Sequence, residues 1–204
     1  MMDFSRAYIK ELQDILDCFP HEAFERLVQA MLAARACGQQ IFVMGNGGSA
    51  STASHWVCDI NKGCSYGKDE RFRMICLNDS LSTVLAYAND VGYEDIFVEQ
   101  LKNFFHPGDM VIGISGSGNS KNVLKAIEYA NENSGLTVGL CGYDGGRLAR
   151  IVDICLHVPI CDMQKAEDAH MIIAHMAVQA ICCADLSQST ISEHRVRLLA
   201  RIKS

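Results

Sequence analysis

The chain has few prolines and no long apolar run. Only three of its 204 residues are proline, while hydrophobic residues make up 49%. This composition argues against long disordered segments. No apolar stretch is long enough to cross a bilayer, and the N-terminus has no signal-peptide pattern. We therefore expect a globular, cytoplasmic protein with no membrane segment.

Basic charge is also scarce. Lys and Arg number 18 against 24 Asp and Glu, which gives a net charge of −6. This balance provides none of the basic surface by which proteins bind nucleic acid, so we expect no nucleic-acid partner. The exception is the basic, amphipathic tail from His194 to Lys203. Its pattern favours a packing or subunit-contact helix over a membrane-binding or nucleic-acid-binding arm.

Cysteine is abundant, but the usual metal and redox spacing is missing. The chain has ten cysteines, none of which form a C-x-x-C pair, and several lie within apolar runs. This pattern favours reduced, mostly buried thiols in a reducing compartment.

Apolar runs alternate with helical patterns after a helical N-terminal segment. Helical spacing from Phe4 to Ala36, with a break at Phe19-Pro20-His21, predicts two helices. Predicted strands cover 41–44, 73–77, 110–114, 136–141 and 154–158, and predicted helices cover 50–60, 80–89, 119–132, 146–150 and 165–186. The alternation indicates a doubly wound α/β fold, a three-layer αβα sandwich around a parallel sheet. We expect one domain over 1–204, with N-terminal helices at 1–36, an α/β core at 37–186 and a tail at 187–204.

Two glycine-rich turns stand between a predicted strand and a predicted helix. They are Gly45-Asn46-Gly47-Gly48-Ser49 and Ser115-Gly116-Ser117-Gly118-Asn119-Ser120. The N–H groups of such turns, together with a helix N-terminus, hold anions. Ligands of these sheets bind beyond the carboxyl ends of the strands, where both turns lie. Neither turn matches a nucleotide P-loop or a dinucleotide fingerprint, and hydroxyls without a lysine suit a phosphate monoester.

Acidic residues and histidines near these turns are candidates for chemistry. His55 and Asp59 are i and i+4 on the helix after the first turn, so they project from one face. Glu167 and His175 lie in the last long helix, about 12 Å apart along its axis. One metal can hardly take both from a straight helix. If both act, one comes from a neighbouring subunit, or Glu167 lies in a frayed first turn. His170 points elsewhere and is interpreted as a structural or interface histidine.

Five motifs occur in an order that resembles one known family. They are G-N-G-G-S-A-S-T-A-S-H, A-N-D-V-G-Y-E-D-I-F, S-G-S-G-N-S-K-N-V-L-K-A-I, G-Y-D-G-G-R-L-A and E-D-A-H-M-I-I-A-H. From about Ile9 to Leu186 the chain resembles the sugar isomerase (SIS) domain, in its phosphoheptose (sedoheptulose 7-phosphate) isomerase branch. The resemblance implies a five-stranded parallel sheet and a homotetramer with active sites where subunits meet. It also implies interconversion of a ketose phosphate and an aldose phosphate, in several members with zinc. One relative in the branch instead binds the bacterial replication initiator.

The resemblance also implies roles for individual residues. Substrate binding is implied for Asn46, Gly47, Gly48, Ser49, Asn89, Asp90, Ser115, Gly116, Ser117, Ser120 and Glu167. Among these, the serines should hold the phosphate, and Asn46, Asn89 and Asp90 should lie near the sugar hydroxyls. Asp59 and His175 are the implied catalytic residues. A divalent metal, with zinc favoured, is expected on His55, Asp59, Glu167 and His175.

Three positions depart from the family's pattern. Gly116 stands where threonine is common, so one phosphate donor is missing. Asp59 replaces the glutamate assigned as general base, and Glu167 replaces a glutamine. Two interpretations remain open. In one, a metal-assisted enediol mechanism uses the Asp59 carboxylate as base and an imidazole as acid. In the other, the pocket is kept but the chemistry is lost, leaving a sugar-phosphate-binding or initiator-associating protein. Isomerisation of another sugar phosphate is a third possibility.

Overall fold

The computed structural model describes residues 2–202, with side chains for residues 3–185. Helices α1 (Met2–Asp17) and α2 (His21–Ala36) come first, and the chain breaks between them as predicted. The strands are β1 (Gln40–Gly45), β2 (Arg73–Cys76), β3 (Met110–Ser115), β4 (Leu136–Cys141) and β5 (Ile154–His157). All five overlap the predicted strands.

Helices alternate with these strands. They are α3 (Gly48–Cys58), α4 (Leu81–Asp90), α5 (Val98–Phe104), α6 (Lys121–Glu132), α7 (Leu148–Ile151) and α8 (Met163–Ile202). A π-helical turn, η1 (Asp59–Gly63), continues α3, and a 3₁₀ turn, η2 (Tyr93–Asp95), follows α4. The sequence reasoning did not predict α5, η1 or η2. The predicted tail, 187–204, lies outside the residues whose side chains are described.

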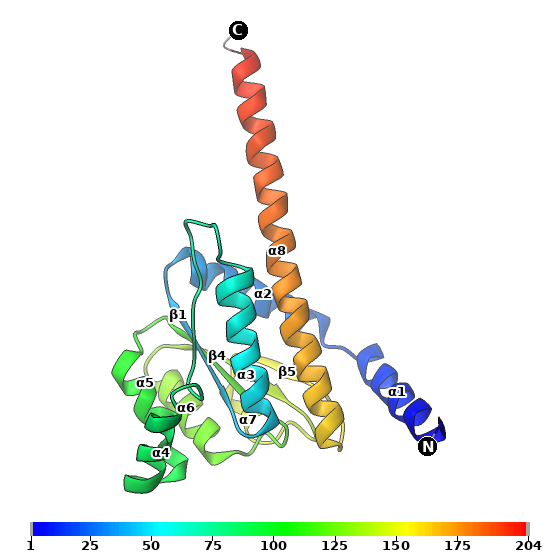
Figure 1. Cartoon of the computed structure of the whole chain (residues 1–204), viewed down its shortest axis with the longest axis vertical. Helices are drawn as coiled ribbons and strands as arrows, with labels where there is room; N and C mark the ends of the chain where they lie inside the picture. Colours follow the sequence, from blue (N-terminus) through cyan, green and yellow to red (C-terminus); the bar gives the residue numbers. More distant parts are fainter. Residues whose placement is uncertain (1, 203–204) are drawn as a thin grey trace.

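The five strands form one parallel sheet in the order β2-β1-β3-β4-β5. Because successive side chains of a strand point to opposite faces, β1 contributes to two separate cores. Ile41 and Val43 pack under α2, α3 and α8, whereas Phe42 packs under α5, α6 and α7. Figure 1 shows the sheet between these two groups of helices. The three-layer αβα prediction is confirmed.

The strand order places both glycine-rich turns at the same point of the sheet edge. β1 pairs with β2 on one side and with β3 on the other, so the chain reverses its winding direction between β1 and β3. Ligands of doubly wound sheets bind at such a switch point. The two turns approach each other closely there, since a Cβ added to Gly45 would lie 2.9 Å from the carbonyl oxygen of Ile114. Gly118, with φ +63°, likewise approaches the backbone at Gly145.

Ion pairs attach α8 to the rest of the chain at both ends of the part whose side chains are described, residues 163–185. Near its start, the ammonium of Lys165 contacts Glu11 of α1 at 2.8 Å and Asp162 at 2.6 Å. At the other end, Asp185 accepts two hydrogen bonds from Arg35 of α2, at 2.6 and 3.0 Å. The Arg35 guanidinium holds the pKa of Asp185 below its usual value. Figure 1 shows α1 projecting from the body beside the start of α8.

The described cysteines form no disulfide with one another, but the expectation that most of them are buried is wrong. All ten thiols are free, and five of them are exposed: Cys18, Cys37, Cys58, Cys161 and Cys183. Cys18 and Cys37 follow the ends of α1 and α2, where the chain turns at the surface. Only Cys64, Cys76 and Cys141 are fully buried. Apolar neighbours in the sequence therefore do not show on which side of an element a single thiol lies.

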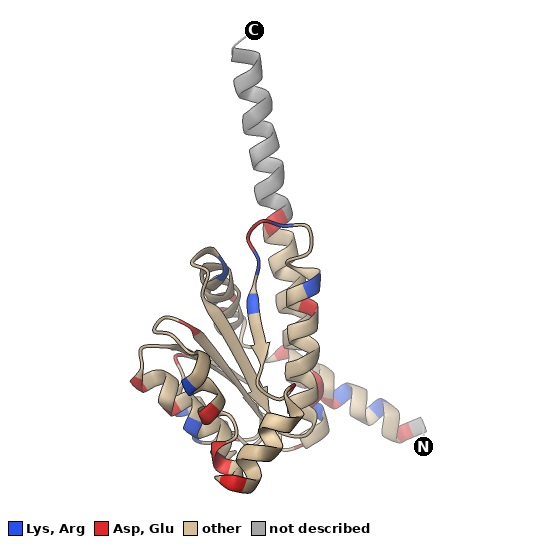
Figure 2. Ribbon diagram, turned by 60° about the vertical axis from the view of Figure 1, so that its left-hand side comes forward, with Lys and Arg blue, Asp and Glu red and all other residues tan. Residues whose placement is uncertain are grey.

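Residues of opposite charge are mixed along the described chain. Figure 2 shows Lys and Arg interspersed with Asp and Glu along the helices. Within the described residues, no helix is both long and apolar enough to cross a membrane.

Candidate active site

The two glycine-rich turns enclose a small polar cavity, which we call the cradle. Its volume is about 120 Å³, and it is lined by Asn46, Ser49, Ile114, Ser115, Gly116, Ser117, Ser120, Met163 and Glu167. The N-termini of α3 and α6 both open beside it. Helix N-termini attract negative charge, and serine hydroxyls donate hydrogen bonds to phosphate oxygens. The cradle therefore has the donors and the size for one phosphate group.

Hydrogen bonds between side chains hold the walls of the cradle in place. The hydroxyls of Ser115 and Ser120 lie 3.0 Å apart, one at each end of the second turn. The amides of Asn46 and Asn122 exchange two hydrogen bonds of 2.9 Å, which join the first turn to α6. The Tyr93 hydroxyl donates to the same Asn46 oxygen at 2.8 Å. The cradle is therefore positioned before any ligand arrives.

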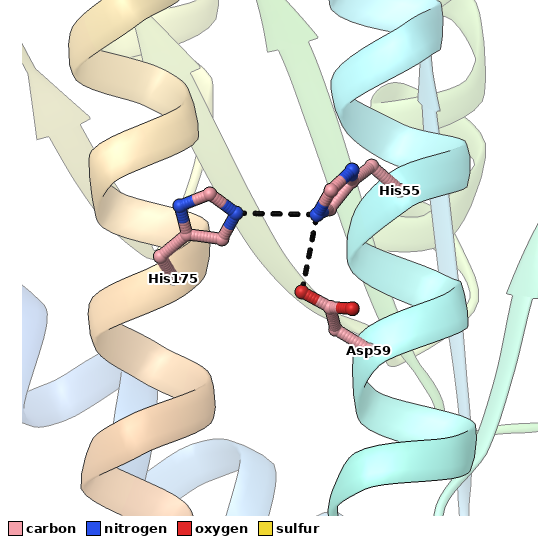
Figure 3. Close-up of side chains that lie close together, drawn as sticks. All are labelled: His55, Asp59 and His175. Carbon is pink, nitrogen blue, oxygen red and sulfur yellow. Dashed lines mark hydrogen bonds and ion pairs between the residues drawn. The ribbon is translucent and has the colours of Figure 1, made fainter.

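A second cluster of polar side chains lies further along α3 and α8. It consists of His55, Asp59 and His175, and we call it the histidine–aspartate group. Figure 3 shows the side chains of His55 and Asp59 facing that of His175 across the space between the two helices. The Nε2 atoms of the two histidines are 3.1 Å apart, and His55 Nε2 lies 3.2 Å from Asp59 Oδ2. Asp59 is the first residue of the π-helical turn η1. Such π-helical turns are frequent at functional sites.

These three side chains fit a divalent metal ion. One possible ligand atom from each lies within 4.8 Å of the others. A zinc–nitrogen distance of about 2.0–2.1 Å implies ligands about 3.3 Å apart around a tetrahedral ion. The separations of 3.1 and 3.2 Å are close to that value. Three protein ligands with a fourth position open are also typical of catalytic zinc sites.

Glu167 does not join this group within one chain. Its carboxylate lies in the cradle, beside Gly48 at the start of α3. Eight residues of straight helix separate it from His175, which corresponds to about 12 Å. Among the described residues, the possible metal-binding group consists of His55, Asp59 and His175. The predicted four-residue metal set is thus not assembled by this chain alone.

Comparison with known proteins identifies the family of the chain. The profile of the SIS domain matches residues 7–142. The phosphoheptose isomerase of Geotalea daltonii is 36% identical over 200 residues, which cover 96% of this chain and 100% of that protein. The chain belongs to the SIS domain family, in its phosphoheptose isomerase branch.

Solved structures of the same branch have the same fold. The phosphoheptose isomerase GmhA of Neisseria gonorrhoeae aligns with a TM-score of 0.82 at 26% identity, covering 89% of this chain and 98% of that one. The phosphoheptose isomerase of Francisella tularensis aligns with a TM-score of 0.79 at 26% identity, covering 88% and 97%.

Two residues assigned from the SIS resemblance lie away from the cradle. Asn89 and Asp90 form the C-terminal end of α4, and the Asn89 amide donates to the Asp90 carboxylate at 2.7 Å. Asp90 lines a different, open cavity of about 460 Å³, along α4. Within one chain the structure does not bring these two residues to the serine turns. Their predicted contact with sugar hydroxyls stays a prediction.

Sequence reasoning missed three residues at this SIS site. Asn122 is buried and bonded to Asn46, and Tyr93 bonds to the same side chain. Met163, at the start of α8, covers Gly116 with its sulfur. Asn122 and Tyr93 lie inside motifs that carry the family resemblance, so those motifs were an available signal. No local pattern marks Met163, because its contact with Gly116 depends on how α8 docks.

His170 is not part of the site, in line with its structural interpretation. Its side chain is fully buried on the inner face of α8, and neither ring nitrogen has a hydrogen-bond partner in the described structure. Burial lowers the pKa of His170 to about 4, because a charged imidazole is poorly solvated there. His170 is therefore neutral at physiological pH.

Proposed function

We propose that this protein is a phosphoheptose isomerase that interconverts sedoheptulose 7-phosphate and an aldoheptose 7-phosphate. One observation carries the proposal: α3 and α8 each contribute side chains to the cradle and also bring together the histidine–aspartate group, His55, Asp59 and His175. From Ser49 to His55 the helix rises about 9 Å. A seven-carbon sugar with its phosphate in the cradle is long enough to bring its carbonyl end to that group. The curated relatives named phosphoheptose isomerase support the same reaction.

The reaction moves one proton between carbons and one between oxygens. In the ketose-to-aldose direction, a base removes a proton from C1, an enediol forms, and the proton is delivered to C2. Another proton moves from O1 to O2. We assign the base to Asp59, whose carboxylate is partly exposed beside the two imidazoles. The serines of the cradle hold the phosphate and so fix the position of C1 and C2.

We propose that His55, Asp59 and His175 hold a divalent metal, with zinc favoured. When bound, the ion polarises the substrate carbonyl and lowers the energy of the enediol. His175 faces the group with Nε2, and a nitrogen that binds a metal cannot also donate a proton. Its roles as ligand and as acid are therefore alternatives, and the metal content of variants decides between them.

We also propose a cytoplasmic homotetramer. α4 has no buried residue, and its Leu81 and Leu85 side chains are 66% and 58% exposed. Such an apolar helix face is typical of a subunit contact. The free thiols of all ten cysteines support a reducing compartment.

The test of the isomerase is direct. Zinc-loaded protein is incubated with sedoheptulose 7-phosphate in D₂O, and formation of aldose and deuterium at C2 are followed by NMR. We expect turnover by the wild type and a loss of about 10²- to 10⁴-fold in kcat for Asp59→Asn. The exposed Asp69→Asn is the matched control and should behave as wild type. Absence of aldose with both wild type and Asp59→Glu would contradict the proposal.

Metal binding is measured separately, by elemental analysis of the purified variants. Wild type is expected to hold about one ion per chain, and His55→Ala to lose it. The exposed His106→Gln is the control. Loss of the ion in His175→Ala assigns His175 as ligand, whereas retention with lost activity assigns it as acid.

A further inference from the structure

A negatively charged side chain lies inside the cavity proposed to receive phosphate. Glu167 lines the cradle together with the serines of both turns. A Cβ built on Gly48 would lie 2.2 Å from Glu167 Oε2 and 2.4 Å from Oε1. The carboxylate of Glu167 is therefore in close contact with the backbone of Gly48, the first residue of α3. This contact concerns residues of one chain and needs no bound ligand.

The position of this carboxylate has a simple electrostatic reason. α3 is 11 residues long, and the N-terminus of a helix has a partial positive charge that stabilises nearby anions. No basic side chain is among the residues that line the cradle in the described structure. Lys165, two residues before Glu167, pairs instead with Asp162 and Glu11. The N-termini of α3 and α6 are thus the positive ends that open beside the cradle, and Glu167 lies against that of α3.

Phosphate and the Glu167 carboxylate cannot both occupy this place. The cradle has a volume of only about 120 Å³, so a phosphate in it would lie within a few ångströms of the carboxylate. Two like charges at that distance repel strongly in a partly buried site. Glu167 is half-buried and has a flexible side chain, so it is able to turn toward solvent.

We propose that the Glu167 carboxylate is an internal competitor of phosphate: it occupies the anion site of the empty protein and moves aside when a phosphate monoester binds. The inference rests on the proposed function, because it concerns the same cradle. It predicts that the site discriminates against free inorganic phosphate. A sugar phosphate gains contacts along α3 that offset the displacement of Glu167, whereas inorganic phosphate gains nothing outside the cradle.

The experiment measures binding of inorganic phosphate, and of a sugar-alcohol phosphate that cannot be isomerised, by titration calorimetry. Wild type is compared with Glu167→Gln and Glu167→Ala. We expect both variants to bind inorganic phosphate at least 10-fold more tightly. Glu167→Gln removes the negative charge and adds an amide donor, whereas Glu167→Ala only removes the charge, so the two variants separate these effects. Asp168→Asn is the matched control, since it removes the neighbouring exposed carboxylate, and it should change affinity less than 2-fold.

The other outcomes overturn the inference in distinguishable ways. Unchanged or weaker phosphate binding by both variants means that Glu167 does not compete, and the proposed isomerase is unaffected. Tighter binding by the glutamine variant alone assigns the gain to a new donor and also overturns the competitor. The inference is also overturned if Mg²⁺ strengthens phosphate binding by wild type but not by Glu167→Gln. In that case the carboxylate binds phosphate through a cation instead of competing with it. If neither wild type nor variants bind phosphate or convert the sugar, the proposed function fails as well.

Discussion

At the scale of single residues, the cradle is rich in hydroxyls except at Gly116. The hydroxyls of Ser115 and Ser120 are already in mutual contact, and Ser117 lines the same cavity. A Cβ added to Gly116 would lie 3.2 Å from the sulfur of Met163. That sulfur belongs to a flexible side chain at the rim of the cavity, so it is able to yield. Position 116 can therefore accept a side chain that adds a donor.

We expect Gly116→Thr to strengthen phosphate binding. A hydrogen bond to a charged group contributes about 1.5–3 kcal/mol, so the KM for the sugar phosphate should fall about 10-fold or more. Steady-state kinetics and phosphate inhibition measure the effect. Gly116→Ala is the control, because it fills the same space without a hydroxyl. An equal change in KM for Gly116→Thr and Gly116→Ala would show that filling the space near Met163, and not the added hydroxyl donor, causes the change in phosphate binding.

At the scale of elements, α8 determines how the site is assembled. Its inner face buries Ala166, Ala169 and Ile173 against the sheet, and the same helix presents Glu167 to the cradle and His175 to His55. His170 lies on that inner face, fully buried and without a hydrogen-bond partner for its ring nitrogens. The docking of α8 therefore depends on an imidazole that stays neutral.

We expect His170 to make the protein sensitive to mild acid. Its folded pKa of about 4 is below the unfolded value of about 6.5, so the unfolded chain binds the proton more tightly. Stability is therefore complete above pH 6.5 and falls as the pH drops from there toward 4. The loss between pH 7 and pH 5 should be about 2 kcal/mol.

Urea unfolding of His170→Leu tests this prediction. The variant should lose less stability than wild type between pH 7 and pH 5, whatever its stability at pH 7. His106→Gln changes an exposed histidine and should keep the wild-type dependence on pH. Parallel pH profiles for wild type and His170→Leu would refute the role of His170.

At the scale of the whole molecule, the chain exposes apolar surface that a single copy does not cover. Leu81 and Leu85 are one turn apart on α4, and Val91 follows at 60% exposure. α1 adds Phe4 and Ile9, which are 73% and 54% exposed. Apolar surface on two separate elements is the reason to expect an assembly larger than one chain.

We expect four chains per particle, measured by sedimentation, and dissociation of that assembly by Leu85→Glu. A carboxylate at the centre of the α4 face would be buried without a partner in the contact. Asn103→Glu places the same group on an exposed polar site of α5 and should leave the assembly intact. A wild-type monomer, or a tetrameric Leu85→Glu variant, would contradict this use of α4.

Most elements of the fold were predictable from the sequence because their signals are local. Apolar runs between turns marked all five strands, and Pro20 marked the break between α1 and α2. The short helix α5 was missed because its seven residues give too few turns for a periodic pattern. The π-helical turn at Asp59 was missed because it continues α3 without a change in residue type.

By itself, the sequence determined the strands, the two glycine-rich turns and the pairing of His55 with Asp59, since each depends on neighbours within a few residues. Only the tertiary structure decided which distant segments meet. It placed His175 beside His55, 120 residues away, and Glu167 in the cradle rather than beside His55, Asp59 and His175. These contacts depend on how α3 and α8 pack on one face of the sheet, and that packing results from the burial of many apolar side chains together.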